Sequence, residues 1–193
     1  MRRSEAPPEK SPSKVHSAGP REGALSGEKR RAKVCRIIGI DPGLASTGWG
    51  VVDCAGGKVR YVDHGSIETG AERPRAERLF FIGQSVRSIL DSFRPDEAAI
   101  ENIYFGRNVS SAIPVAEARG VISAALAGRG LPVHELRPNE IKKGVAGISG
   151  ADKKQVQEMV RIILGLSDIP KPDHAADALG AAICAAHRQV QGI

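Results

Sequence analysis

Hydrophobic positions after residue 33 recur at two spacings, which predict strands and helices. Short apolar runs such as VCRIIGID (34–41) end at an acid or a turn and are typical of strands. The segment after Pro74 instead carries an apolar residue every three or four positions, as one face of a helix does. The predicted strands cover 34–41, 47–53, 58–68, 97–102 and 131–136. The predicted helices cover 74–93, 112–127, 139–145, 153–164 and 173–188.

The order of these segments predicts the fold class. The first three strands follow one another through short turns, with Gly56-Gly57 as a hairpin signal, so we expect them to be antiparallel. The later strands alternate with helices, which favours parallel pairing. The sequence therefore predicts an α/β domain with a mixed sheet covered by helices. Asp152, at the end of the glycine-rich loop 147–152, is placed to cap the helix over 153–164.

Length and composition exclude several classes of protein. The 193 residues suit one domain, and no apolar run approaches the roughly 20 residues that cross a bilayer. The start, MRRSEAPPEK, has no apolar stretch behind it and is not expected to be a secretory signal. Cys35, Cys54 and Cys184 are too few and too scattered for a disulfide framework or a zinc site. We therefore expect a reducing, cytoplasmic compartment.

Most of the net charge of +6 belongs to the first 33 residues. They contain nine Lys or Arg against four Glu and are rich in Pro, Ser and Gly, so we expect a disordered basic extension over 1–33 and a folded domain over 34–190. Both a basic arm on phosphate backbones and a merely solvated extension fit this composition. The folded part has a net charge of only +1, so any binding to DNA there requires locally clustered basic residues.

Acidic residues fall at the ends of two predicted strands. Asp41 ends the first strand and Glu101 lies near the end of the strand over 97–102. Acids are costly to bury alone, and these two would meet if their strands were adjacent and parallel. The last predicted helix adds His174 and Asp177, three residues apart and so on one helical face, among alanines that allow close approach to the sheet.

Three carboxylates and one imidazole that converge would repel one another unless a divalent cation lay between them. Oxygen-rich ligands suit Mg²⁺ or Mn²⁺, and such a cluster can hold two ions for an in-line phosphoryl displacement. The pattern alone leaves structural roles open, because an acid at a strand end also caps turns and a histidine among alanines also packs in cores.

Five segments carry a resemblance to a known family. They are IIGIDPGLASTGWGVVD (37–53), AAIENIYFGRN (98–108), EARGVISAAL (117–126), GISGADKKQVQEMV (147–160) and HAADALGAAICAAH (174–187). Together, and in this order, they resemble the RuvC family of crossover junction endodeoxyribonucleases, which resolve Holliday junctions. The similarity extends over residues 36–187 without a large gap.

The resemblance implies a ribonuclease-H-like fold, with a five-stranded mixed sheet flanked by helices and an acidic site at its centre. It implies Asp41, Glu101, His174 and Asp177 as catalytic residues and as ligands of two Mg²⁺ ions. The family often has an aspartate at the position of His174, and imidazole shifts the preference toward Mn²⁺. Asp173, next to His174, matches the family motif less well.

The resemblance also implies contacts with DNA. Tyr104 matches an aromatic position that stacks on bases, and Lys142 and Lys153 match positions that contact phosphates. A loop side chain folded onto the core, and a solvated helix face, are the structural alternatives for these residues. The full predicted set of DNA-binding residues is Tyr104, Arg107, Asn108, Lys142, Lys143, Lys153 and Lys154.

The implied partners are a four-way DNA junction, a second copy of the chain in a homodimer, and a branch-migration motor (RuvA–RuvB). Small residues in the helix over 112–127 suit a dimer interface and core packing equally. Two other functions compete: a YqgF-type nuclease that acts on ribosomal RNA precursor, and a non-catalytic junction-binding module. An actin-like kinase is disfavoured, because about 160 folded residues are too few for its two lobes.

Overall fold

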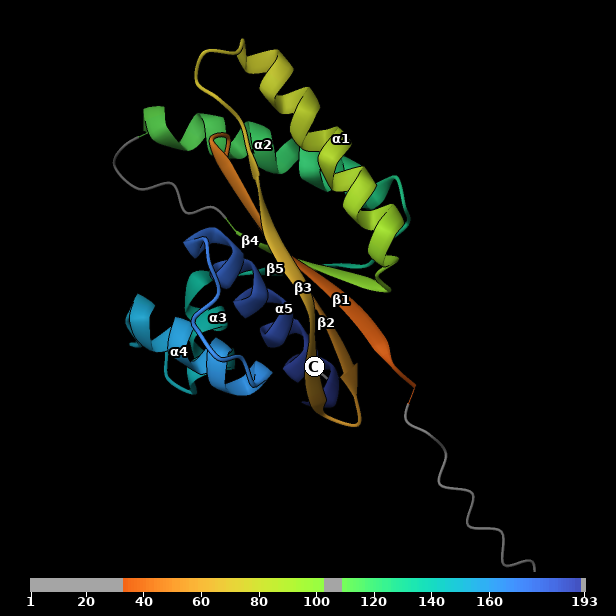
Figure 1. Cartoon of the computed structure of the whole chain (residues 1–193), viewed down its shortest axis with the longest axis vertical. Coiled ribbons are helices and arrows are strands. Elements are labelled where there is room, and N and C mark those ends of the chain that lie inside the picture. The colour runs from red at the N-terminus through yellow and green to blue at the C-terminus, as the bar shows by residue number, and fades with distance from the viewer. Residues whose placement is uncertain (1–32, 103–108, 192–193) are drawn as a thin grey trace, which may run out of the picture. The chain divides into compact units, whose positions relative to one another are not determined.

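A computed structural model of the chain describes residues 33–102 and 109–191 (Figure 1). Its strands are β1 (Cys35–Asp41), β2 (Ser46–Ala55), β3 (Lys58–Glu68), β4 (Glu97–Glu101) and β5 (Val133–Leu136). Its helices are α1 (Arg75–Phe93), α2 (Val109–Ala127), α3 (Pro138–Ala146), α4 (Lys153–Leu164) and α5 (Asp173–Gln191).

The five strands form one mixed sheet in the order β3-β2-β1-β4-β5. Strands β1, β2 and β3 are antiparallel neighbours, whereas β4 pairs parallel to β1 and β5 parallel to β4. The predicted five-stranded mixed sheet flanked by helices is therefore confirmed. Strand β1 lies at the centre of the sheet, and its last residue is Asp41.

Helices cover both faces of the sheet, with α1 and α2 on one face and α3, α4 and α5 on the other (Figure 1). Successive residues of a strand point to opposite faces, so Ile38 and Ile40 pack with α1 and α2 while Ile37 packs with α5. Two separate buried clusters result, one on each side of the sheet.

Helix α5 lies directly against the main chain of the sheet. A Cβ atom added at Gly39 would come within 2.7 Å of the Ala182 amide nitrogen and would overlap the carbonyl oxygen of Ala178. A Cβ atom at Gly48 would likewise overlap the backbone of His174. The glycines of β1 and β2 and the buried alanines of α5 therefore set how closely this helix approaches the strands.

The C-terminus of α3 and the N-terminus of α4 are both capped. Helix α3 ends at Gly147, whose φ of 78° is in the left-handed region that glycine adopts without strain. Helix α4 begins with a capping box: Asp152 Oδ1 accepts a 2.9 Å hydrogen bond from the Gln155 amide, and Gln155 Oε1 accepts one from the Asp152 amide. The predicted cap is confirmed, and it makes Lys153 the first residue of α4.

The structure corrects several predicted boundaries, among them those of α2, α5 and β5. Helix α2 begins at Val109 rather than 112, with Pro114 inside it, and α5 continues to Gln191 rather than 188. Strand β5 begins at Val133 rather than 131, because Pro132 before it has no amide hydrogen to donate to a neighbouring strand. In the described part of the chain, no helix combines the length and the hydrophobicity that a membrane span requires.

Candidate metal-dependent active site

Strands β1 and β4 bring two acids to the same edge of the sheet. The two strands are parallel, and Ile40 pairs with Ile100, so Asp41 and Glu101 follow at equivalent positions. Both acids end their strands, and both are half-buried. The condition under which these two acids would meet, adjacent and parallel strands, is therefore fulfilled.

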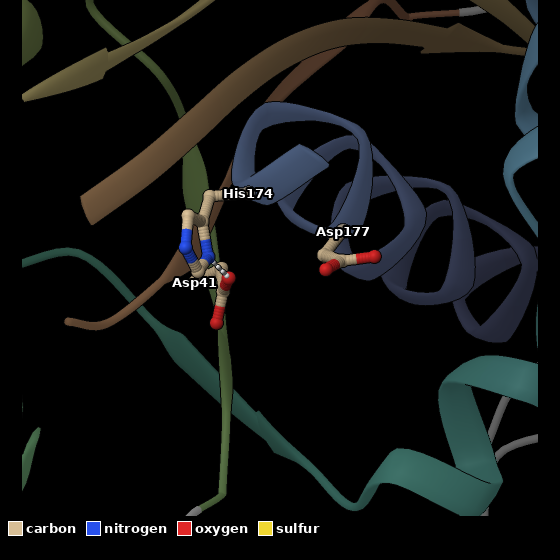
Figure 2. Close-up of side chains that lie close together, drawn as sticks. All are labelled: Asp41, His174 and Asp177. Atoms are coloured by element: carbon tan, nitrogen blue, oxygen red, sulfur yellow. Dashed lines mark hydrogen bonds and ion pairs between the residues drawn. The ribbon is translucent and has the colours of Figure 1, made fainter. Parts of the chain in front are cut away.

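Helix α5 adds two more side chains to this edge (Figure 2). His174 Nδ1 lies 2.7 Å from Asp41 Oδ2, and Asp177 follows one turn later on the same face of the helix. One potential ligand atom from each of Asp41, His174 and Asp177 lies within 4.8 Å of the other two. Three side chains that are up to 136 positions apart in sequence therefore form one group.

This group has the donor chemistry of a divalent cation site. Ligand atoms on opposite sides of a Mg²⁺ ion are about 4.2 Å apart, twice the ion–oxygen distance of about 2.1 Å. A spread of 4.8 Å therefore needs only small side-chain adjustments to enclose an ion. Two carboxylates and an imidazole suit Mg²⁺, Mn²⁺ and related ions, so the residues fit the metal that the sequence predicts.

Burial works against the charge of Asp41. Removal from water raises the pKa of this carboxyl, while the hydrogen bond to His174 and the charge of that ring lower it. The charge of Asp177 adds to the rise, and on balance the pKa of Asp41 is above its usual value. The Asp41 side chain is only 18% exposed, so a cation at this site would satisfy a poorly hydrated carboxylate.

Burial and the neighbouring carboxylates also raise the pKa of Glu101. Burial raises its pKa to about 7, and the charges of Asp41 and Asp177 contribute to the rise. The carboxylate of Glu101 is not a member of the 4.8 Å group, yet it lies close enough for these charges to act on it. A carboxyl with this pKa is about half protonated at neutral pH, and such strongly shifted groups are typical of functional clusters.

The structure places one predicted DNA contact in an unexpected position. The Lys153 ammonium lies 3.0 Å from Asp177 Oδ2 and 3.4 Å from Asp173 Oδ2. Partial burial opposes its charge, but the bonds to the two aspartates raise the pKa of Lys153 on balance. Asp173 is 68% exposed and does not belong to the group of Asp41, His174 and Asp177, so it holds Lys153 rather than the metal-site residues.

The other predicted basic residues within the described part of the chain are on α3 and α4. Lys142 on α3 is half-buried, and its charge reaches Glu101, whose pKa it lowers. Lys143 and Lys154 are exposed at the end of α3 and the start of α4. Tyr104, Arg107 and Asn108 lie outside the described residues.

Arg119 on α2 was not among the predicted residues. Its guanidinium donates a 2.9 Å hydrogen bond to Asn102 Oδ1 and forms a 2.9 Å ion pair with Glu135 on β5. Arg119 thus fastens the residue directly after Glu101 to α2 and β5. The signal in the sequence was its place in the segment EARGVISAAL (117–126), which also carries the family resemblance.

The fold and the position of the acids define the class of protein. A mixed sheet in the order β3-β2-β1-β4-β5, with acids at the ends of β1 and β4 and on the helix packed against them, is a ribonuclease-H-like arrangement. The chain also resembles a yeast mitochondrial Holliday junction resolvase in structure, with a TM-score of 0.60 at 14% identity, which shows the fold alone.

The comparisons with known proteins identify the family. Residues 37–185 match the family described as crossover junction endodeoxyribonuclease RuvC. A RuvC protein of Chloroflexus aurantiacus is 51% identical over 152 residues, which cover 79% of this chain and 93% of the relative. A RuvC protein of Treponema denticola is 49% identical and covers 82% of this chain and 88% of the relative.

Solved structures agree. Thermus thermophilus RuvC superposes with a TM-score of 0.76 at 36% identity, covering 81% of this chain and 96% of that one. The same protein in complex with a Holliday junction substrate gives a TM-score of 0.77, covering 82% and 96%. The chain belongs to the RuvC family of crossover junction endodeoxyribonucleases.

Proposed function

We propose that this protein is a structure-selective endonuclease that resolves Holliday junctions by symmetric, metal-dependent nicking of DNA during recombination and repair. The observation that carries the proposal is the meeting of Asp41, His174 and Asp177 within 4.8 Å, beside Glu101, in a chain of the RuvC family. The family acts on four-way DNA and depends on divalent cations, and the site chemistry fits both properties.

In this proposal Asp41, Glu101, His174 and Asp177 hold two divalent cations, with Mg²⁺ as the main ion and Mn²⁺ as the alternative. Bound there, the ions would supply an activated water and stabilisation of the leaving oxygen, chemistry that would leave a 5′-phosphate and a 3′-hydroxyl. The raised pKa of Glu101 means that this side chain must give up a proton when a cation binds near neutral pH.

The two ring nitrogens of His174 have different roles in this proposal. An ionised Asp41 accepts the hydrogen bond from His174 Nδ1, which leaves the lone pair on Nε2. Nε2 then binds a cation or accepts a proton, and Asp41 fixes the orientation of the ring for either task. The backbone of Gly48 packs on that of His174. The main-chain position from which the ring extends is therefore fixed at the start of α5.

The proposed DNA-binding residues are those that the sequence predicts. Lys142, Lys143, Lys153 and Lys154 provide a local basic cluster beside the acids, in a folded domain with little net charge. Tyr104, Arg107 and Asn108 complete the set on the segment that follows β4.

The proposal extends to the assembly and its setting. Two matched nicks in a two-fold symmetric junction require two identical sites, so we propose a homodimer. A branch-migration motor of the RuvA–RuvB type is the proposed partner, and the cytoplasm the proposed compartment. The domain over 34–190 carries the nuclease, and 1–33 is proposed as a disordered basic extension.

The test is a nicking assay with four-way junctions against linear duplexes of the same sequence, with Mg²⁺ or Mn²⁺. The wild-type protein should nick junctions symmetrically and leave linear DNA intact. Asp41→Asn should lower the nicking rate by about 10²-fold or more while junction binding persists, since even an indirect metal contact is worth 10–100-fold. Asp168→Asn, which makes the same charge change at an exposed site, should leave the rate unchanged.

The outcomes separate the alternative functions. Retained nicking by Asp41→Asn removes this residue from the site. Cleavage of ribosomal RNA precursor in preference to junctions would favour the YqgF-type function. Binding without cleavage by the wild-type protein, with either ion, would favour a non-catalytic junction-binding module.

A further inference from the structure

Lys153 is a cation that the protein itself supplies to the edge of its metal site. Its ammonium lies 3.0 Å from Asp177 Oδ2 and 3.4 Å from Asp173 Oδ2, so it bridges two acids one helical turn apart on α5. Asp177 is also one of the three residues whose ligand atoms gather within 4.8 Å. One carboxylate therefore serves both the lysine and the metal-binding group.

The backbone of Lys153 holds the ammonium near this carboxylate. Lys153 is the first residue of α4, directly after the capping box of Asp152 and Gln155, so its main chain is fixed by two 2.9 Å hydrogen bonds. The side chain remains 52% exposed and is not locked in a core. The lysine can thus leave Asp177 without any change in the fold, and it stays tethered nearby.

A divalent ion and an ammonium on the same carboxylate repel each other. Two unit charges 4 Å apart interact strongly even when water screens them, and a divalent ion doubles the effect. The field of Lys153 also reaches the other acids of the site, because its charge lowers the pKa of both Asp41 and Glu101. Any cation at Asp177 must therefore bind against Lys153 or move it away.

We propose that Lys153 is a tethered competitor of the divalent ions, which weakens metal binding at Asp177 until its ammonium is drawn to another anion. The inference rests on the proposed function in one respect, since a DNA phosphate is the anion that a junction nuclease would offer. Lys153 is then a residue that sets metal affinity, in addition to its predicted contact with phosphate. A site of this kind loads its ions most readily when substrate is present.

The test measures metal binding by the full-length protein without DNA, by calorimetric titration with Mn²⁺. Lys153→Met removes the charge and keeps an unbranched side chain only one atom shorter, and it should tighten Mn²⁺ binding by about tenfold, or about 1.4 kcal/mol. The rise in melting temperature at a fixed Mn²⁺ concentration should grow in parallel. Lys153→Arg keeps the charge and should bind Mn²⁺ with an affinity near that of the wild type.

Lys154→Met is the matched control, because it removes the same charge one position further along α4. Among the described residues Lys154 forms no ion pair, and its replacement should change Mn²⁺ affinity by less than about twofold. Unchanged or weaker Mn²⁺ binding by Lys153→Met would overturn the proposal. An equal gain in both variants would also overturn it, because general electrostatics would then explain the result. The titration uses no DNA, so a failure of the wild type to nick junctions would refute the proposed function separately.

Discussion

The two faces of the sheet are packed in different ways. On the face covered by α1 and α2, large branched side chains of both layers fill the space between helix and strand, among them Ile38, Ile40, Ile82, Ile100, Ile122 and Leu126. On the other face, main chain meets main chain where α5 crosses Gly39 of β1 and Gly48 of β2, and Leu179 packs on Gly50.

The residues of the proposed site lie on the closely packed face. His174 and Asp177 reach Asp41 because the backbone of α5 lies directly against the strands at Gly39 and Gly48. On the other face a helix could shift by a fraction of an ångström as its side chains repack, since volume matters more there than shape. The small residues of α5 and β1 therefore determine the geometry of the site as well as filling the core.

The largest effect is expected from Gly39→Ala. The added methyl group overlaps the backbone of α5 at Ala178 and Ala182, which are main-chain atoms and cannot rotate away. We expect a loss of roughly 3 kcal/mol or more in the free energy of unfolding, measured with urea. Any folded protein should bind Mn²⁺ at least about tenfold more weakly, because α5 must move outward. Wild-type stability and Mn²⁺ affinity in this variant would refute the close contact.

A smaller effect is expected from Glu101→Gln, and it depends on pH. The pKa of Glu101 is raised to about 7 in the fold, so ionising this residue costs the folded state more than the unfolded chain as pH rises from about 4.5 to 7. The wild type therefore loses stability over this range, whereas a neutral glutamine does not.

With EDTA present, Glu101→Gln should match the wild type near pH 5 and exceed its stability near pH 8. The gain should be on the order of 1–2 kcal/mol after allowance for solvent screening. Urea unfolding at the two pH values measures it. Glu72→Gln, at a side chain that is 75% exposed, is the control and should show no such difference. A gain that is equal at both pH values would contradict the raised pKa.

The smallest effect is expected on the opposite side of the molecule, from Gly120→Ala in α2. Nothing lies within 4 Å of a Cβ atom added there, and the residue is exposed in a helix. We expect a gain of about 0.5–1 kcal/mol, because alanine loses less conformational entropy than glycine when the helix forms. Thermal unfolding would detect it, with Mn²⁺ affinity unchanged. A loss of stability would show that the two faces do not differ as described.

The sequence was sufficient for the elements and for most of the site. Helix α4 was predicted with its observed bounds, because Asp152 caps it and an apolar stripe follows at helical spacing. The grouping of Asp41, His174 and Asp177 was expected from the family resemblance, and strand ends and a three-residue spacing on a helix are compatible with it.

The partners of the charged side chains were harder to foresee. Lys153 was assigned to phosphate contact, but its ion pairs join residues 20 and 24 positions away, and no local pattern encodes such a distance. The contacts of Arg119 could not be foreseen for the same reason. They link α2 to the end of β4 and to β5, and they form only once these three elements have packed. Arg119 is one of 28 Lys and Arg residues, and its residue type alone does not distinguish it from the others.

Strand β1 has a hydrogen-bonded neighbour along each edge, in contrast to β3 and β5 at the rims of the sheet. Proteins open in local steps, and segments at a rim exchange their amide hydrogens through smaller fluctuations than segments at the centre. Transient detachment of β3 or β5 therefore leaves the backbone before Asp41 paired on both sides. Asp41, the proposed metal ligand, is thereby carried by a central strand, and we expect this strand to open more slowly than the edges.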